Sequence, residues 1–440
     1  MKCIEDEIPF EVPEGWAWCR LNSIVDVRDG THDTPTYVDK GIPLITSKNL
    51  VEGGIDYSNV KYISEKDAIS INERSGVNIG DILFAMIGTI GNPSMVTEDI
   101  LISIKNVALF KFTFSKNLSN HFVMYFLDYA QEDMKNKPSG GLQPFVSLNF
   151  LRTYLVPIPP VEEQQRIVSI LADSINKIRN IDVLKNELTA SVKKAKSKIL
   201  DLAIRGKLVP QDPNDEPASV LLERIRDEKE ELIKQGKIKR DKKESVIFKG
   251  DDNSYYEKIG NDVTCIDDEI SFDIPDTWSW TRISTITDIT MGSSPKSQDI
   301  CNDNQYIEFH QGKIYFSKKT LMKSNQYTRK TTKLAPKQSV LLCVRAPVGE
   351  LNITDRDICI GRGLASIKSL GNINEEFIFY WLHPYKTYLV NQSTGSTFSA
   401  ITSDTVRNIL IPLPPLMEQK EILNKIQKVF TLLENLETVN

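Results

Sequence analysis

The chain has 440 residues, of which 40% are hydrophobic and 26% charged, which corresponds to roughly three domains of a soluble protein. No apolar run reaches the roughly 18 residues of a membrane helix, the first ten residues are too acidic for a signal peptide, and the six cysteines form no Cys-x-x-Cys pair. We therefore expect a cytoplasmic protein without membrane contact, and the net charge of −5 gives no overall attraction to nucleic acid.

The chain carries two sets of markers in the same order, which predicts a tandem duplication of a long unit. The segment CIEDEIPFEVPEGWAWCR at Cys3–Arg20 returns as CIDDEISFDIPDTWSWTR at Cys265–Arg282, with ten of 18 positions identical. Likewise, RTYLVPIPPVEEQQRI at Arg152–Ile167 returns as RNILIPLPPLMEQKEI at Arg407–Ile422.

The first globular unit is predicted at residues 1–158. Short β-branched runs broken by Gly, Asn and Pro, with a helix-like stretch at His121–Tyr129, indicate a mixed α/β fold. Trp16 and Trp18, like Trp278 and Trp280 of the second unit, are two residues apart, so on a strand both rings of a pair lie on one face, where we expect them in the core. Two segments, Gly30–Tyr37 and Ile45–Leu50, are rich in hydrogen-bonding side chains, which fits either base contacts or ordinary turns.

A long helix is predicted at residues 159–206, after the stiff Pro-rich exit. Steps of four and three from Ile167 give 11 seam positions over 36 residues, nine of them apolar, and Arg205-Gly206-Lys207 ends the pattern. At about 1.5 Å per residue such a helix is roughly 54 Å long. The heptad pattern is typical of a coiled coil, with these expected seam residues: Ile167, Leu171, Ile178, Ile181, Leu188, Val192, Ile199 and Leu202.

Residues 207–264 are predicted as a charged linker with one helix at Ala218–Lys234, the rest lying on the surface. We interpret the basic run Lys237–Lys243 as a solvated face rather than a nucleic-acid contact.

The second unit is predicted at residues 265–413 and a shorter heptad helix at residues 414–440. This helix is the natural antiparallel partner of the first, although each helix could instead pack on its own unit. Its expected seam residues are Ile422, Ile426, Val429, Leu433 and Leu436.

Basic residues are concentrated between Glu308 and Glu350, where there is no acid and nine basic residues occur. Cations bind phosphates and amides read base edges, so this mixture favours a DNA face over a solvated or protein-docking one. The nine are Lys313, Lys318, Lys319, Lys323, Arg329, Lys330, Lys333, Lys337 and Arg345.

Motifs for catalysis are missing from the sequence. There is no P-loop, no Asp/Asn-Pro-Pro-Tyr element and no glycine-rich nucleotide loop. The four histidines have no metal-ligand spacing, and an acidic–x–Lys arrangement of Asp404, Glu418 and Lys420 falls at the start of the predicted coil. These observations favour a non-catalytic binding protein without metal or cofactor.

Two globular units, each closed by P-x-P-P-x-x-E-Q and followed by a heptad helix, resemble the specificity (S) subunits of type I restriction–modification systems. The resemblance covers essentially the whole chain and includes EIPFEVPEGWAW, EISFDIPDTWSW and GKLVPQDPNDEPASVLLERI. It implies an α+β fold in which two similar mixed α/β target recognition domains are joined by long heptad helices that pair as an antiparallel coiled coil.

The resemblance also implies a function. Each unit would read one half of a bipartite, asymmetric double-stranded DNA target, while the helices set the spacer and dock two methyltransferase (M) subunits. Restriction/translocase (R) subunits would join for cleavage. S-adenosylmethionine, ATP and Mg would be bound by these partners, which methylate adenine N6 and cut DNA, and this chain would catalyse neither step. Because the offset aligns Asn440 with Lys185, we expect part of the first helix to pair with an M subunit or a second copy.

The basic stretches and the recurrent patterns DGTHDTP…GIPLITSKNL and MGSSPKS…FHQGKIYF together predict the DNA-contacting residues. The alternatives are the recognition subunit of a type IIB/IIG-like system with a fused methyltransferase–nuclease partner, a coiled-coil scaffold without DNA, and a self-sufficient methyltransferase. The predicted contacts are Thr31, His32, Thr34, Ser47, Lys48, Asn49, Lys135 and Lys137 in the first unit, and Ser293, Ser294, Lys296, His310, Gln311, Lys313, Lys318, Lys319, Lys323 and Arg345 in the second.

Overall fold

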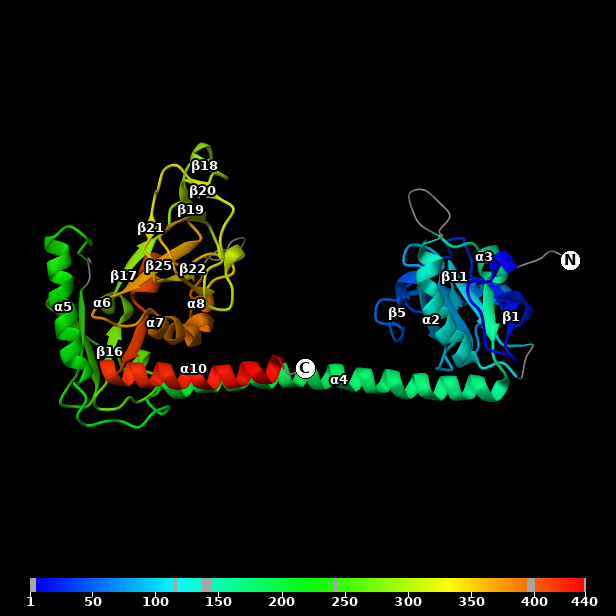
Figure 1. Ribbon diagram of the computed structural model, residues 1–440, viewed down its shortest axis with the longest axis horizontal. Coiled ribbons are helices and arrows are strands. Elements are labelled where there is room, and N and C mark those ends of the chain that lie inside the picture. The colour runs from blue at the N-terminus through cyan, green and yellow to red at the C-terminus, as the bar shows by residue number, and fades with distance from the viewer. Residues whose placement is uncertain (1–4, 114–116, 137–144, 241–243, 394–399, 439–440) are drawn as a thin grey trace. The chain divides into compact units, whose positions relative to one another are not determined.

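A computed structural model describes residues 5–113, 117–136, 145–240, 244–393 and 400–438 (Figure 1). The chain divides into two compact units, Met1–Val183 and Leu184–Asn440. One continuous helix, α4 (Val161–Ile204), contributes residues to both units. Among the described residues, no helix combines the length and the apolar character needed to cross a membrane.

The first unit is built around a four-stranded antiparallel sheet in the order β2-β11-β8-β9. Its central strands alternate between two cores: Ile82 and Phe84 pack on the side of α2, whereas Leu83 and Ala85 pack on the side of a second sheet. That sheet has the order β10-β4-β7-β3. The elements of this unit are β1 (Ala17–Arg20), β2 (Asp26–Asp29), β3 (Tyr37–Val38), β4 (Ile42–Ile45), β5 (Leu50–Val51), β6 (Gly54–Ile55), β7 (Lys61–Ile63), α1 (Glu65–Ser75), β8 (Ile82–Ala85), β9 (Gly91–Met95), β10 (Ser103–Ile104), β11 (Val107–Lys111), α2 (Asn120–Asn136), α3 (Leu148–Thr153) and β12 (Leu155–Ile158).

The second unit repeats this plan, which confirms the predicted duplication. Its central sheet has the order β17-β25-β22-β23, and a second sheet has the order β18-β20-β19-β24-β21. Among the residues of this unit that the structure describes, no helix is equivalent to α1, and the acid-free stretch takes its place. The elements are β16 (Ser279–Arg282), α6 (Ile283–Ile286), β17 (Thr287–Met291), β18 (Ile300–Cys301), β19 (Ile307–His310), β20 (Tyr327–Thr328), β21 (Leu334–Ala335), β22 (Ser339–Cys343), β23 (Leu351–Thr354), β24 (Ile358–Ile360), β25 (Leu364–Ser369), α7 (Glu375–Leu382), α8 (Lys386–Asn391), α9 (Ser403–Arg407) and β26 (Leu410–Leu413).

The duplicated markers join the start of each unit to its end. Strand β1 pairs with β12, and β16 pairs with β26. The Trp16 indole N–H donates to Glu163 over 3.1 Å, and the Trp278 indole N–H donates to Glu418 over 2.7 Å. Each indole–carboxylate bond therefore links the Trp-x-Trp marker to the glutamate of P-x-P-P-x-x-E-Q.

The glutamine of the exit marker also has a structural role. The Gln164 side-chain amide donates to the Pro159 carbonyl over 3.0 Å, and Gln419 donates to Pro414 over 2.9 Å. Because proline removes a backbone donor and holds the chain extended, these bonds satisfy carbonyls at the entrance of α4 and of α10 (Leu416–Thr438).

The prediction that the two rings of a Trp pair share one face is wrong in the second unit. Trp278 packs on Trp381 with ring centres 6.0 Å apart, whereas Trp280 packs on Phe272 at 5.1 Å, in a separate cluster. Strand β16 begins only at Ser279, so Trp278 lies in the preceding turn, where the alternation of a strand does not apply.

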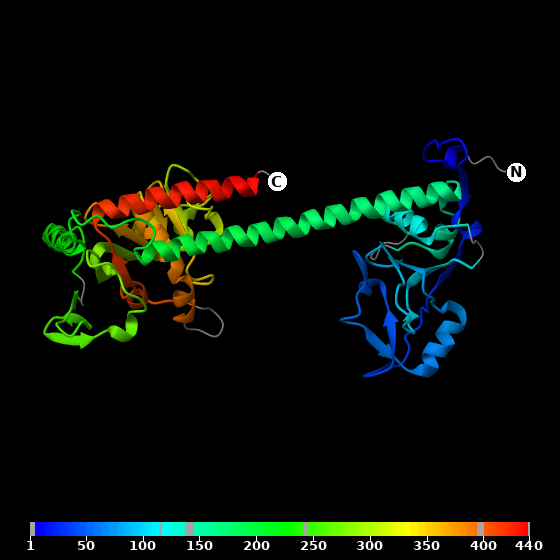
Figure 2. The ribbon, with the colours of Figure 1, turned by 90° about the horizontal axis from the view of Figure 1, so that it is seen from below.

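Helices α4 and α10 pair antiparallel, as Figures 1 and 2 show for the second unit. Lys196 forms an ion pair with Glu434 at 3.0 Å, while Gln211, just past α4, bonds to Glu418 at 2.6 Å. Residue numbers thus rise along one helix as they fall along the other. In this pairing Val192, Ile422 and Ile426 are buried, and Ile199, Leu202, Val429 and Leu433 are half-buried.

The predicted seam is covered only along the C-terminal part of α4. Leu171, Ile178 and Ile181 are 37%, 59% and 61% exposed, and Leu436 of α10 is 54% exposed. Leu188 is half-buried, and Ile167 packs on the core of the first unit. The alternative that the helices pack on their own units therefore holds for the start of α4.

Residues 207–264 are not a surface linker, contrary to the prediction. Helix α5 (Ala218–Lys234) has the predicted bounds, but its apolar face is buried in the core of the second unit. Beyond it, β13 (Ser245–Lys249), β14 (Tyr255–Ile259) and β15 (Asp262–Cys265) form an antiparallel sheet, and β13 packs against β16. Lys237 and Lys239 are exposed as expected, and residues 241–243 lie outside the described residues.

Candidate nucleic-acid interface

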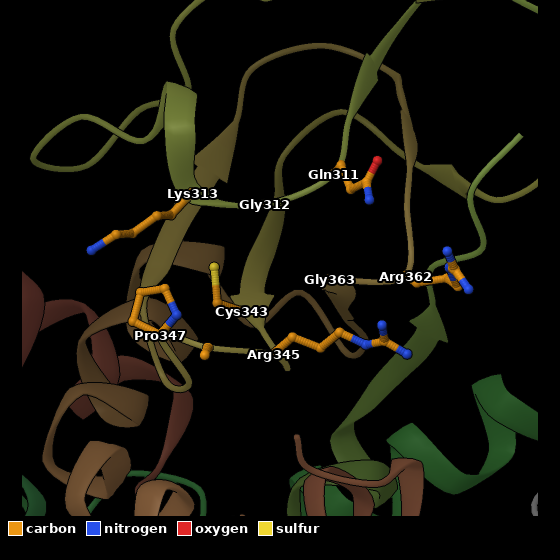
Figure 3. Close-up of a pocket in the computed structure, with 9 residues that line it drawn as sticks. Gln311, Gly312, Lys313, Cys343, Arg345, Pro347, Arg362 and Gly363 are labelled. Atoms are coloured by element: carbon orange, nitrogen blue, oxygen red, sulfur yellow. The ribbon is translucent and has the colours of Figure 1, made fainter. Parts of the chain in front are cut away.

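In the second unit, three loops meet at one edge of the second sheet. Strands β19 and β24 run parallel, so the loops that follow them emerge together. Gln311 and Lys313 follow β19, Arg362 follows β24, and Arg345 follows β22. They line a cavity of about 250 Å³, the cationic pocket (Figure 3), whose lining residues are Gln311, Gly312, Lys313, Cys343, Arg345, Ala346, Pro347, Arg362 and Gly363.

The cationic pocket has two guanidinium groups available for a ligand. Figure 3 shows Arg345 and Arg362 extending to the same side, with Lys313 extending to the other. Within the described part of the chain, neither arginine has a carboxylate partner, whereas the Lys313 ammonium lies 3.6 Å from Glu350. Burial raises the pKa of the Cys343 thiol to about 12, so this side chain adds no negative charge. Unpaired guanidiniums of this kind bind phosphates or guanine edges.

Glycines allow the loops after β19 and β24 and the segment after β17 to approach closely. A side chain at Gly292, just after β17, would lie 2.1 Å from the Gly361 carbonyl oxygen, and one at Gly363 would lie 2.2 Å from the Gln311 carbonyl oxygen. Ser294 accepts a hydrogen bond from the Arg362 backbone N–H over 3.2 Å. The predicted residues Ser293 and Ser294 thus belong to the same edge as Gln311.

The first unit has an equivalent edge. Strands β4 and β10 are parallel, so the loop with Ser47 and Lys48 lies near Lys105, and Thr31 forms a bridge with Lys105. The Lys105 ammonium donates to the Thr34 hydroxyl over 2.8 Å. The five polar residues Thr31, His32, Lys48, Lys105 and Asn106 form what we call the polar edge.

His32 lies between two acceptors on the polar edge. Its Nδ1 is 2.8 Å from the Asn106 side-chain oxygen, and its Nε2 is 2.9 Å from Asp29. Hydrogen bonds to Asn106 and to Asp29 raise the pKa of His32 above its ordinary value. The imidazole therefore gains positive charge as the pH falls towards its pKa.

Two predicted contacts lie inside the protein, which corrects the prediction for both. His310 is 1% exposed and its Nε2 lies 2.9 Å from Glu308, and burial lowers its pKa. It occupies the strand position of Ile45, since each pairs with the parallel neighbouring strand. Asn49 is 6% exposed and closes a capping box with Thr46.

The remaining predicted residues lie away from the pocket or have partners. Lys296, Lys318 and Lys323 are exposed. Lys319 forms an ion pair with Glu376 at 2.6 Å, so its charge is already compensated, and Lys135 pairs with Glu132 at 2.6 Å. Lys137 lies outside the described residues.

Acids that flank the basic stretch reduce its charge. Glu350 contacts Lys313 and so compensates one cation of the stretch, whereas Glu308 pairs with Arg356, which lies outside the stretch, and with the buried His310. Burial raises the pKa of Glu308, but hydrogen bonds from Arg356, the Ser324 N–H and His310 outweigh burial and lower it to about 2. The free cations are therefore fewer than the sequence indicates.

Sequence reasoning missed Arg362 and did not select Lys105. Arg362 lies outside the acid-free stretch because Asp355 and Asp357 come before it. The usable signal was the turn after a short apolar strand, Gly361-Arg362-Gly363 in one unit and Lys105-Asn106 in the other. No group of three or more metal-ligating side chains was found among the described residues.

A duplicated fold with polar, cationic loops at the ends of parallel strands is typical of a modular nucleic-acid-binding protein. The family described as Type I restriction modification DNA specificity domain matches residues 13–190 and 275–440. The chain belongs to this family and is a type I specificity subunit with two such domains.

Relatives match over nearly the whole chain. The putative type I restriction enzyme MjaX specificity subunit of Methanocaldococcus jannaschii is 27% identical over 436 residues, which cover 96% of this chain and 89% of the relative. The EcoAI specificity subunit of Escherichia coli is 24% identical, covering 97% and 79%.

Solved structures share the fold. A chain from a structure on complex assembly and conformational transition of the type I R-M system aligns with a TM-score of 0.66 at 22% identity, covering 98% of this chain and 94% of that chain. The HsdS subunit from Thermoanaerobacter tengcongensis aligns with a TM-score of 0.55 at 24% identity, with the same coverage.

Proposed function

We propose that each unit of this specificity subunit reads one half of a split, asymmetric DNA sequence through its loop edge. The observation that carries the proposal is that equivalent edges hold different side chains. The first unit presents Thr31, His32 and Lys105, and the second presents Arg345 and Arg362. Different donors and acceptors on one scaffold select different base pairs.

The chemistry of the edges divides into two roles. Exposed cations such as Lys48 and Lys318 bind phosphates and position the duplex. Gln311 and Asn106 present donors and acceptors that match base edges in the major groove, and the two arginines of the cationic pocket can bind either a phosphate or a guanine edge. Thus the same loops supply both affinity and specificity.

The helices are proposed to set the spacer and to dock two M subunits. The support is the exposed apolar side of α4, where Ile170, Ile178 and Ile181 are 66%, 59% and 61% exposed. Exposed apolar stripes of this size favour a helical partner. We propose that an M subunit, or alternatively a second copy, covers this part of α4.

The catalytic chemistry is proposed to reside in the partners. The M subunits would bind S-adenosylmethionine and methylate an adenine flipped out of the duplex, and R subunits with ATP and Mg would cleave DNA. This chain would hold no cofactor, and the complex would act in the cytoplasm.

Methylome sequencing tests the proposal. Cells with the gene beside its M gene should show one split adenine motif that disappears when the gene is removed; no change in any split motif would refute the proposal.

Variants then assign the halves. Gln311→Ala should change only one half of the motif, and His32→Ala only the other, because these side chains are proposed to contact base edges. Lys258→Ala, an exposed lysine of β14 that belongs to neither edge, is the control.

A further inference from the structure

The first unit has an open cavity beside β1 that the proposed DNA edge does not use. Its volume is about 640 Å³, and we call it the aromatic pocket. Two of its rings are unusually accessible: Phe10 is 44% exposed and Tyr129 is 72% exposed. Exposed aromatic clusters of this kind mark interaction sites. The aromatic residues that line it are Phe10, Trp18, Phe126, Tyr129, Phe150 and Tyr154.

The second unit contains the same face in a covered state. Phe10 packs on Trp18 with ring centres 5.0 Å apart, and the equivalent pair Phe272 and Trp280 lies at 5.1 Å. Trp280, however, is only 3% exposed. The sheet β13-β14-β15 covers it, and Ile247 and Tyr255 of that sheet pack in the same cluster.

Arg20 and Arg282 occupy equivalent positions in the two units, and in the second unit the covering sheet supplies a carboxylate to Arg282. Arg282 binds Glu269 at 2.7 Å and also Glu257 of β14 through two hydrogen bonds of 3.0 and 2.7 Å. Arg20 binds the counterpart of Glu269, Glu7, at 2.5 Å. Among the described residues, no second carboxylate reaches Arg20.

The exposure of the two arginines agrees with this difference. The side chain of Arg20 is 33% exposed, against 9% for Arg282. Each guanidinium donates a hydrogen bond to a backbone carbonyl at an equivalent position, Arg20 to Thr153 and Arg282 to Asn408. Arg20 is therefore positioned for a carboxylate that the second unit obtains from its own chain.

We infer that the aromatic pocket binds an extended, mainly apolar segment of a partner protein in the restriction–modification complex, and that this segment carries a single carboxylate, because Glu7, Glu132 and Asp133 already line the pocket. One carboxylate of this segment pairs with Arg20, as Glu257 does with Arg282, and an aliphatic or aromatic side chain covers Trp18. The inference rests on the proposed function only for the source of the partner. The sheet β13-β14-β15 of a second copy is a poor occupant, because it would have to give up the equivalent contacts that it already makes in its own unit.

Photo-crosslinking tests this inference in the full complex with M and R subunits and without DNA. A benzophenone amino acid replaces Tyr129 on the rim of the pocket, and the control places it at Ile69, which is 66% exposed on α1 outside the pocket. We expect adducts only from position 129, joined to an extended segment that mass spectrometry identifies and in which a carboxylate lies among apolar residues.

The charge contact is tested in the same complex. Arg20→Gln should lower the adduct yield by about tenfold or more, while thermal unfolding checks that the first unit remains folded. Arg20→Glu combined with a Lys in place of the identified partner carboxylate should restore the yield, which a purely structural role of Arg20 would not allow.

Three outcomes overturn the inference: an adduct with a second copy of this chain, an adduct formed only with added DNA, or a yield equal to that of the Ile69 control. The split methylation motif is measured separately. Loss of the adduct with the motif intact refutes the pocket alone, and a retained adduct without any motif refutes the DNA proposal alone.

Discussion

Replacement of Arg345 and Arg362 by alanine should weaken DNA binding and flatten its dependence on salt. Both guanidiniums lie on one side of the cationic pocket and lack carboxylate partners among the described residues, whereas Lys313 is partly compensated by Glu350. If each arginine neutralises one phosphate, each loss lowers the slope of log affinity against log salt by about 0.9, and both together by about 1.8. Between about 50 and 200 mM salt, the deficit of the double variant should therefore shrink about 12-fold.

Fluorescence anisotropy of a labelled duplex carrying the split motif measures this effect, with the specificity subunit in its assembled complex. Lys258→Ala, a charge removal of the same kind outside the pocket, should leave the slope unchanged. An unchanged slope in the double variant would refute the phosphate contacts. If affinity then also fell by about 1–3 kcal/mol per arginine with relaxed choice at one base pair, the guanidiniums would be reading bases instead.

Three further predictions concern other parts of the chain. Trp278→Phe should destabilise the second unit by about 1–3 kcal/mol, because it removes a hydrogen-bond donor from the carboxylate of Glu418, which is 2% exposed. Trp16→Phe should destabilise the first unit less, since the acceptor Glu163 is only half-buried. Equal losses of hydrogen-exchange protection in the two units would contradict this. Glu308→Gln should remove roughly 3 kcal/mol of stability at neutral pH, since the pKa of Glu308 is about 2 in the folded protein against an ordinary 4.5. The parent protein keeps this stability above about pH 4.5 and loses it as the pH falls towards 2. Equal acid sensitivity of parent and variant in denaturant unfolding would rule out this contribution of Glu308. The raised pKa of His32 predicts that DNA affinity falls as the pH rises through and above about 6.5, and this fall should be absent from His32→Asn in the same anisotropy assay; a fall of equal size in the variant would assign it to another group.

The repeated architecture could be predicted because the markers at the two ends of each unit recur in the sequence, and directional contacts between the two ends restrict which residues they can contain. The hydrogen bond between the indole of Trp278 and the carboxylate of Glu418 requires both residue types in a defined geometry, so both residues recur with their neighbours in each unit. Helix α5 was placed correctly at Ala218–Lys234 because a polar segment with an apolar stripe at helical spacing has few other stable conformations.

The loop edges could not be predicted in full because they depend on strand pairing between distant segments. Arg362 and Gln311 line the same pocket because β19 and β24 pair in parallel, and no local sequence pattern reveals this pairing. His310 looked like a polar contact within a basic stretch, but the period of the strand turns it inward. The sheet β13-β14-β15 was missed because its short strands are mostly exposed and mix polar with apolar residues.

The indole–carboxylate bonds and the pairs β1–β12 and β16–β26 close each unit at its own entry and exit. A segment that begins before the tryptophans and finishes after the glutamate is therefore closed by its own contacts, and in the second unit helix α5 and the end of α4 complete its core. We call this segment a cassette. Recombination between the two repeated markers could exchange one cassette for another without changing the sequence of the helices that follow. If each unit reads one half-site as proposed, a cell could in this way acquire a new half-site in one genetic event, while the exposed side of α4 that is proposed to dock the M subunits stays unchanged.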